Sequence, residues 1–296
     1  CGLKGIRKRP NENFQFLTLE LADEIAKKIS KDRWTSRIEF AMHGEPTENV
    51  HYVDIIKIFR ERLPRSYLLL TTNGYGLLRY PYPNVFSNVQ ALEIAGINTI
   101  ALDCYEYANF YKKILDQLDQ HHFPYQWYPD AIEVNPHKRD KGFKFVAIRD
   151  ISVATNGTHS VLNNHAGAGA PKNNSAQFEP CAKPFRELSI RWDGNVAICC
   201  NDWRGEYKVG NISGYSSINS LWQDPKFLAA RKKLVFGIRN FGPCHGCDAR
   251  SYRTGLLPDR KGLKILPPFT EIDQGHIDEA VSGLPFTKPV KRPWEM

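Results

Sequence analysis

The 296-residue sequence contains no run of about 18 consecutive apolar residues, the length that a membrane-spanning helix requires. It also has no basic segment followed by an apolar core at its start, so nothing in it marks the chain for secretion. We therefore expect a cytoplasmic protein with no membrane partner. Met is scarce, with only 2 in the chain, and the first residue is Cys1. This beginning predicts that the complete protein continues upstream of Cys1.

Neither apolar residues nor length is lacking. Hydrophobic residues make up 42% of the chain, and about 300 residues can bury the core of one large or two modest domains. The formal net charge is +8, but the Lys and Arg residues occur in small groups with acids between them. This dispersal favours a solvated surface that attracts anionic small molecules over a nucleic-acid-binding surface.

The cysteines argue against a disulfide framework, because there are 7 of them, an odd number, in a chain without a secretion signal. Cys1 and Cys104 stand alone. The other five lie within one stretch of the C-terminal half, at Cys181, Cys199, Cys200, Cys244 and Cys247. Reduced cysteines gathered in this way predict a metal or metal-cluster site.

The first half of the chain alternates helical and strand patterns. Thr18 can cap a helix that runs to about Ser30, where the apolar residues have helical spacing. Further helices are expected at 49–63, 86–95 and 105–121, and strands at 37–42, 67–71, 98–103, 127–134 and 144–150. Such alternation predicts a parallel sheet with helical crossovers, hence an α/β domain over residues 1–150.

The second half differs in composition. Residues 151–180 are rich in Gly, Asn, Ala and Ser, which predicts a linker. A small α+β domain is expected at 181–250, and the Pro-rich residues 251–296 predict an irregular tail. The elements expected in the small domain are a β-hairpin around Asp193-Gly194-Asn195, a short strand and one helix, at 188–200, 208–212 and 217–235.

Polar segments follow two neighbouring strands of the predicted sheet. His43-Gly44-Glu45-Pro46 follows the first, and Thr71-Thr72-Asn73-Gly74 follows the second. Because parallel strands end at the same edge of a sheet, we expect a carboxylate, exposed backbone and polar side chains to lie together there. This is a place where a cofactor with an amino group and a ribose can be held.

Four thiolates suffice for a metal site in the small domain. They are expected from Cys181, from Cys199, and from the CxxC pair Cys244 and Cys247. Thiolate sets of this kind bind zinc or iron–sulfur clusters, and ligand chemistry alone leaves both open. Cys199 and Cys200 are adjacent on a predicted strand and point to opposite faces, so at most one of them is expected to face the site.

The segment Phe40-Ala-Met-His-Gly-Glu-Pro-Thr-Glu48 resembles the Gly-Gly-Glu-Pro element of radical S-adenosylmethionine (SAM) enzymes, with His43 in place of the first Gly. In that superfamily the element binds the methionine amino group of SAM. Thr72-Asn73-Gly74 resembles the element on the ribose side. The resemblance implies a partial (β/α)6 barrel of the TIM-like kind, lacking its first strand here, with Gly44, Glu45, Pro46, Thr72 and Asn73 as cofactor-binding residues.

The small domain resembles the SPASM/twitch extension of the same superfamily. The matching residues are Cys181, Asp193-Gly194, Cys199-Cys200, Gly210-Asn211-Ile212, Trp222, and Cys244 with Cys247. No cysteine follows Cys247. The resemblance therefore implies the shorter, twitch form, with one auxiliary four-iron four-sulfur (4Fe-4S) cluster.

The SAM-binding cluster of that superfamily needs three cysteines spaced CxxxCxxC. Only Cys1 is present, 43 positions before Gly44, and it is expected to be the third of the set. The first and second cysteines of the set would stand seven and three positions upstream of Cys1, and we expect them to belong to a missing segment. Without them the fragment itself is expected to be inactive.

The resemblance implies an enzyme that reductively cleaves SAM to a 5'-deoxyadenosyl radical and abstracts a substrate hydrogen. The auxiliary cluster would accept an electron or position the substrate. A peptide, a protein or an aminocyclitol-like small molecule is the expected substrate, and a flavodoxin or ferredoxin the expected reductant. Two alternatives remain: a zinc-binding α/β protein that recognises nucleic acid, and a catalytically inactive radical SAM relative that acts as an interaction module.

Overall fold

The computed structural model describes residues 15–105, 109–128, 142–149, 164–168, 180–249, 258–259 and 262–263. The chain divides into two compact units. The first, here called the sheet unit, is Phe14–Leu162, and the second, the cysteine unit, combines Cys1–Asn13 with Asn163–Met296. Among the described helices, none has both the length and the apolar character needed to cross a membrane.

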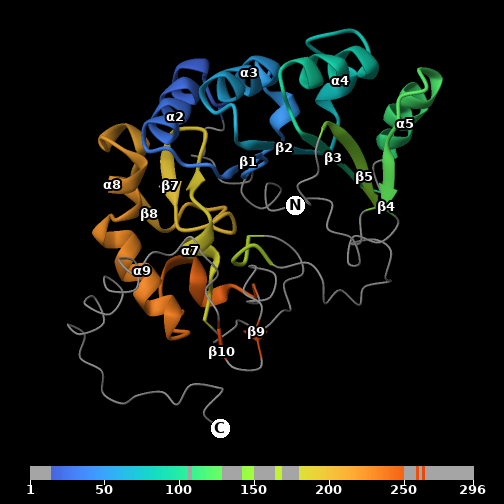
Figure 1. Ribbon diagram of the computed structural model, residues 1–296. Coiled ribbons are helices and arrows are strands. Elements are labelled where there is room, and N and C mark those ends of the chain that lie inside the picture. Colours follow the sequence, from blue (N-terminus) through green and yellow to red (C-terminus); the bar gives the residue numbers. More distant parts are fainter. Residues whose placement is uncertain are drawn as a thin grey trace, which may run out of the picture. The chain divides into compact units, whose positions relative to one another are not determined.

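The sheet unit is built on five parallel strands (Figure 1), which confirms the predicted α/β class. They lie in the order β1-β2-β3-β5-β4. Their bounds are β1 (Arg37–Phe40), β2 (Tyr67–Thr72), β3 (Thr99–Cys104), β4 (Gln126–Tyr128) and β5 (Lys144–Arg149). Strand β5, and not β4, pairs with β3, so the spatial order differs from the chain order that a regular β/α barrel has.

A side chain caps the start of two of the described helices of this unit, at Thr18 and at Asn84. The expected helix after Thr18 is confirmed, because the Thr18 hydroxyl accepts the Leu21 N–H over 3.2 Å. The helices are α2 (Leu19–Lys31), α3 (Tyr52–Arg62), α4 (Val85–Ile94) and α5 (Phe110–Gln120). Helix α3 starts later than predicted, because a separate 3₁₀ turn, η1 (Pro46–Glu48), comes first.

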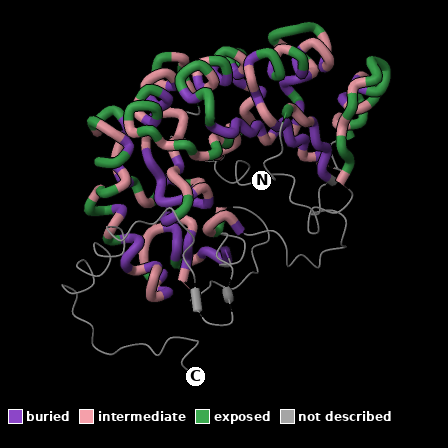
Figure 2. The backbone as a smooth tube through the Cα atoms, in the orientation of Figure 1, coloured by how far each residue is buried: buried purple, intermediate pink, exposed green. Residues whose placement is uncertain are grey.

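Apolar strands form the core of the sheet unit. The central residues of β2, β3 and β5 are fully or almost fully buried (Figure 2), as expected for a parallel sheet with both faces covered. Cys104 ends β3 inside this core, where burial and the neighbouring Asp103 raise the pKa of its thiol to about 12. This environment suits a structural cysteine.

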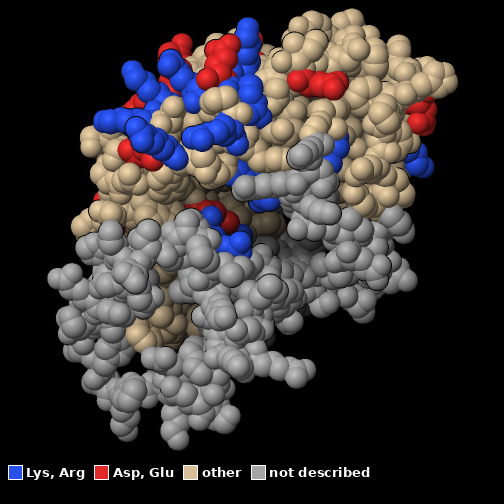
Figure 3. Space-filling model, viewed as in Figure 1, with Lys and Arg blue, Asp and Glu red and all other residues tan. Residues whose placement is uncertain are grey.

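The surface over α2 and α3 carries Lys and Arg side chains with Asp and Glu side chains among them (Figure 3). Lys28 pairs with Glu24 on α2, and Arg62 of α3 pairs with Asp23 of α2. The charges on this face are therefore intermixed, as predicted from their spacing in the sequence.

The cysteine unit contains a three-stranded antiparallel sheet in the order β6-β7-β8. Its strands are β6 (Ser189–Ile190), β7 (Asn195–Ala197) and β8 (Lys208–Asn211). The turn between β6 and β7 contains Gly194 with a φ of 78°, a conformation that favours glycine. A further two-stranded pair, β9 (Pro258–Asp259) and β10 (Gly262–Leu263), lies in the expected tail, most of which is outside the described residues.

Two helices replace the single one expected at 217–235. They are α8 (Ile218–Trp222) and α9 (Pro225–Val235), preceded in the chain by the short α7 (Lys183–Arg186). The prediction of one continuous helix was wrong, because Pro225 has no N–H and disfavours a helical Asp224. The Asp224 carboxylate instead caps α9 by accepting the Lys226 N–H over 2.8 Å.

Candidate functional site

The carboxylate of Glu45 lies at the centre of a hydrogen-bonded cluster after the ends of β1 and β2. Its Oε1 accepts hydrogen bonds from Thr47, through the amide at 3.0 Å and the hydroxyl at 2.7 Å, and from the Thr72 hydroxyl at 2.5 Å. Its Oε2 accepts the Asn73 N–H over 2.7 Å. The structure thus brings together Glu45, Thr72 and Asn73, three of the residues that the sequence singles out.

Local backbone geometry holds this cluster. Glu45 caps the 3₁₀ turn η1, whose first residue is Pro46. Gly76 lies so close to this turn that a Cβ on it would come within 1.8 Å of the Thr47 carbonyl oxygen. The Gly76 N–H also donates to the Thr47 hydroxyl over 3.2 Å. Thr47 is a member that the sequence reasoning missed, because its role depends on this close approach.

Open space adjoins Gly44, the residue before Glu45. Gly44 is exposed, and a Cβ added to it would meet nothing within 4 Å. Burial raises the pKa of Glu45, against the opposing effect of its hydrogen bonds from Asn73, Thr72 and Thr47. The donors that hold Glu45 are neutral, so a bound cation would favour its charged form. The site therefore fits a ligand with an ammonium group, such as the methionine end of SAM.

Four thiols converge in the cysteine unit from three separate segments. Cys181 precedes α7, Cys199 follows β7, and Cys244 and Cys247 belong to the turn η4 (Gly242–Gly246) and its end. All four are buried and none is in a disulfide. Cys181 interacts electrostatically with each of the other three. As they stand, no three His, Cys, Asp or Glu side chains of the described residues form a group that can hold a metal ion.

The surroundings of these thiols suit sulfur ligands. Burial raises the pKa of Cys181, Cys199 and Cys244, so the thiolates need positive charge nearby. A bound iron–sulfur cluster supplies that charge. Main-chain N–H groups approach two sulfurs, from Lys183 to Cys181 and from Ala249 to Cys247, the latter over 3.4 Å. Hydrogen bonds of this kind stabilise cluster thiolates, so the donor set fits such a cluster.

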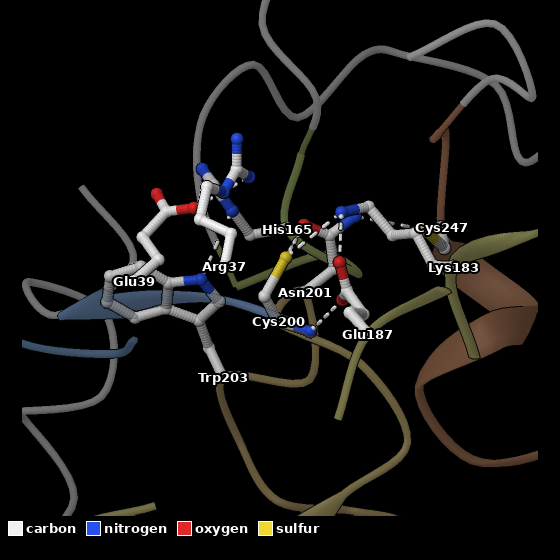
Figure 4. A network of polar contacts seen from close by, with 9 residues as sticks. All are labelled: Arg37, Glu39, His165, Lys183, Glu187, Cys200, Asn201, Trp203 and Cys247. Carbon is white, nitrogen blue, oxygen red and sulfur yellow. Dashed lines mark hydrogen bonds and ion pairs between the residues drawn. The ribbon is translucent and has the colours of Figure 1, made fainter. Parts of the chain in front are cut away.

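Strand β7 ends at Ala197, so Cys199 and Cys200 follow the strand and the alternation of side chains expected for them on a strand was wrong. The Cys200 sulfur accepts a hydrogen bond from Lys183 Nζ over 3.0 Å, and its N–H donates to Glu187 Oε1 over 2.7 Å (Figure 4). Cys199 interacts electrostatically with Glu187, Cys200 and Lys183, and also with Cys181, a thiol of the predicted set. Cys1 lies outside the described residues.

A further polar network supports the CxxC pair. The Asn164 N–H donates to Asp248 Oδ1 over 2.7 Å, and the Asn164 side chain donates to the Gly246 carbonyl over 2.8 Å. The Asn201 side chain donates to the Cys247 sulfur over 4.0 Å. None of these contacts has a signal in the sequence, because Asn164 falls within the expected linker and lies 84 residues from Asp248.

A comparison with models of known protein families finds a match within the cysteine unit. Residues 181–248 match the SPASM family model, described as an iron–sulfur cluster-binding domain, which confirms the resemblance predicted for this part of the chain. No curated protein matches the chain. The likeness to solved structures is distant in sequence but broad in coverage.

One similar structure is that of BtrN in complex with AdoMet and 2-DOIA. It is 22% identical, covers 81% of this chain and 82% of its own, and has a TM-score of 0.59. A second is selenomethionine-containing BtrN in an open conformation, 19% identical, which covers 79% of this chain and 80% of its own with a TM-score of 0.53. At these identities, the two matches establish a shared fold.

Proposed function

We propose that this chain is a radical SAM oxidoreductase with one auxiliary 4Fe-4S cluster. The observation that carries the proposal is that four buried thiols, Cys181, Cys199, Cys244 and Cys247, interact through Cys181 within residues that match an iron–sulfur cluster-binding domain. The finer fold assignment, a partial (β/α)6 barrel followed by a twitch domain, is part of this proposal. So are the domain boundaries predicted at 150, 180 and 250.

The SAM site is proposed at the Glu45 cluster. The similar structure of BtrN contains AdoMet, which is SAM, and Glu45 here is held by hydrogen bonds next to the exposed Gly44, which suits an ammonium ligand. His43 has a φ of 59°. This left-handed conformation favours glycine, which accounts for the Gly that radical SAM enzymes have at the same point of the motif.

When bound, SAM and its cluster supply the electron transfer and the 5'-deoxyadenosyl radical that abstracts a substrate hydrogen. The residues of the chain bind and orient. Glu45 would accept hydrogen bonds from the ammonium group, while Thr72 and Asn73 hold the carboxylate in place. Gly44 is exposed with open space beside it and Pro46 is partly exposed, which would leave room for the ligand. Cys1 would be one of three ligands of the SAM-binding cluster.

In the cysteine unit, the four thiolates would hold the auxiliary cluster. The N–H groups of Lys183 and Ala249 would donate to the sulfurs of Cys181 and Cys247. Because the thiols are buried, water would be kept from the cluster. A site of this kind can accept an electron during substrate oxidation or contact the substrate.

For the substrate, we propose a small molecule of the aminocyclitol-like class, with a peptide as the alternative. The support is the broad likeness to BtrN, a protein whose structure contains 2-DOIA beside AdoMet. A flavodoxin or ferredoxin is proposed as the reductant, and the cytoplasm as the location.

Anaerobic reconstitution with iron and sulfide tests the cluster. The proposal expects broad visible absorption, and about four irons and four sulfides for the auxiliary site. Simultaneous replacement of Cys244 and Cys247 by Ala should abolish this uptake. Stoichiometric zinc binding without iron uptake would instead support the zinc-protein alternative.

The chemistry is tested by assaying the complete protein for reductive SAM cleavage with dithionite or flavodoxin as the electron source. Formation of 5'-deoxyadenosine supports the enzyme. Full iron content without cleavage would support the inactive relative that acts as an interaction module.

A further inference from the structure

A largely buried cation lies beside one thiol of the cysteine unit. The Lys183 side chain is 14% exposed, and its Nζ lies 3.4 Å from Glu187 Oε2 and 3.0 Å from the Cys200 sulfur (Figure 4). Neither Glu187 nor Cys200 has a role in the proposed function. Their contacts with Lys183 therefore need another explanation.

Chain connectivity places this ammonium close to two cluster ligands. Lys183 is the first residue of α7, two positions after Cys181, and Cys200 directly follows Cys199. Glu187 contacts Cys200 as well as Lys183, because its Oε1 accepts the Cys200 N–H over 2.7 Å. Lys183, Glu187 and Cys200 thus join the segment that carries Cys181 to the segment that carries Cys199.

The ammonium keeps its charge in this position. The Glu187 carboxylate pairs with the ammonium over 3.4 Å, and the Cys200 sulfur accepts a hydrogen bond from it over 3.0 Å. Both contacts favour the charged form of a lysine side chain. A positive charge is therefore held between the segments that carry Cys181 and Cys199, in a largely buried place where water screens it less than at the surface.

We propose that Lys183 is a positioning residue that raises the reduction potential of the auxiliary cluster through its fixed positive charge, and that Cys200 anchors this charge and is not a cluster ligand. The inference rests on the proposed function. Reduction adds an electron to the cluster, and a nearby cation stabilises the more negative state. A raised potential makes the cluster a better acceptor of an electron from the substrate.

The test compares reduction potentials in a Cys1→Ala background, which removes the expected SAM-binding cluster and leaves the auxiliary one. Lys183→Met removes the charge but keeps most of the side-chain length, and it should shift the potential to more negative values. Lys183→Arg should keep it close to that of the parent. Lys208→Met removes an exposed lysine of β8 in the same unit and should leave the potential unchanged.

Glu187→Gln distinguishes electrostatics from structure. It removes the negative charge that opposes Lys183, so the potential should shift to more positive values, opposite to the effect of Lys183→Met. A merely structural role would not produce shifts of opposite sign. Cys200→Ser keeps an acceptor for Lys183 and should retain full iron content. If Lys183→Met does not fold, Glu187→Gln and Cys200→Ser decide the question.

Redox titration monitored by electron paramagnetic resonance measures these shifts, with iron and sulfide contents determined for each variant. Full iron content together with unchanged potentials in Lys183→Met or Glu187→Gln would overturn the inference and leave the proposed function intact. Loss of iron in Cys200→Ser would overturn the role given to Cys200. If the parent chain takes up no iron, the proposed function fails and the inference fails with it.

Discussion

The Asn73 N–H donates to Glu45 Oε2 over 2.7 Å, although the two residues are 28 positions apart. The bond joins the turn after β1 to the end of β2 and holds the carboxylate at the edge of the parallel sheet. Glu45 thereby gains a defined orientation before any ligand arrives, which is the property that a binding carboxylate requires.

Glu45→Gln should weaken SAM binding about ten- to hundredfold, because a hydrogen bond to a charged group contributes about 1.5–3 kcal/mol. Isothermal titration of the complete, reconstituted protein with SAM measures the change. Glu48→Gln is the matched control, since Glu48 lies three positions on in the same turn and faces Arg79 over 3.8 Å. Equal losses in the two variants would contradict the role given to Glu45.

The rule that ligands bind at the carboxyl ends of parallel strands predicts this cluster well, because it needs only the chain positions at which two neighbouring strands end. Glu45, Thr72 and Asn73 come together as the sequence indicates. The rule does not predict Thr47, whose contact with Thr72 at 3.2 Å depends on how closely the Gly76 loop approaches the turn. Such approaches depend on tertiary packing and leave no periodic pattern.

In the fold, sequence periodicity predicts the helices and strands better than it predicts which strands pair with one another. The buried run Leu68–Leu70 is recognisable as a strand. In contrast, nothing in the sequence of Gln126–Tyr128 indicates that this strand pairs with β5 at the edge of the sheet. The contact between Lys183 and Cys200 likewise arises from folding over 17 positions, and no spacing rule predicts it. The break before Pro225 did have a signal, because Asp-Pro favours the start of a helix.

Cys199→Ala and Cys200→Ala should differ sharply in iron content. Cys199→Ala removes a proposed ligand and should lower the iron bound after reconstitution, or make the cluster unstable to dilution. Cys200→Ala should retain the iron of the parent, because the Cys200 sulfur accepts a hydrogen bond from Lys183 and is proposed to anchor that side chain. Colorimetric iron and sulfide assays on both variants provide the comparison, and the reverse result would exchange the two assignments.

Arg231 should be a major source of stability in the cysteine unit. It is 3% exposed, donates to the carbonyl oxygens of Pro184 and Trp222 over 2.9 and 2.6 Å, and stacks 3.7 Å from the centre of the Trp222 ring. Arg231→Met should lower the free energy of unfolding by about 2–5 kcal/mol, because it leaves carbonyl groups without these donors. Urea unfolding measures this loss.

The control for Arg231 comes from the same helix. Lys226 is exposed at the start of α9, so Lys226→Met should change the free energy of unfolding by no more than about 0.5 kcal/mol. Arg231→Lys keeps the charge but not the planar set of donors, and should recover only part of the stability. A small effect of Arg231→Met would show that neighbouring side chains can replace these contacts.

His165 should make the stability of the cysteine unit depend on pH. Burial lowers the pKa of its imidazole from 6.5 to about 4, and its Nδ1 accepts the Trp203 indole N–H over 3.1 Å, which requires an unprotonated Nδ1. Between these values the unfolded chain binds a proton that the folded chain does not. The contribution is therefore complete above pH 6.5 and is lost as the pH falls towards 4, by at most about 3 kcal/mol.

Urea unfolding of the chain without clusters, measured at several pH values, should show this loss most clearly as a difference between the parent and His165→Gln. Carboxylates titrate in both proteins and largely cancel in that difference. The parent should lose stability relative to the variant as the pH falls from 6.5 towards 4, and the gap should be constant above that range. Parallel curves across the whole range would mean that His165 has the same proton affinity in the folded and unfolded chains, and would contradict the predicted role of His165 in the pH dependence of stability.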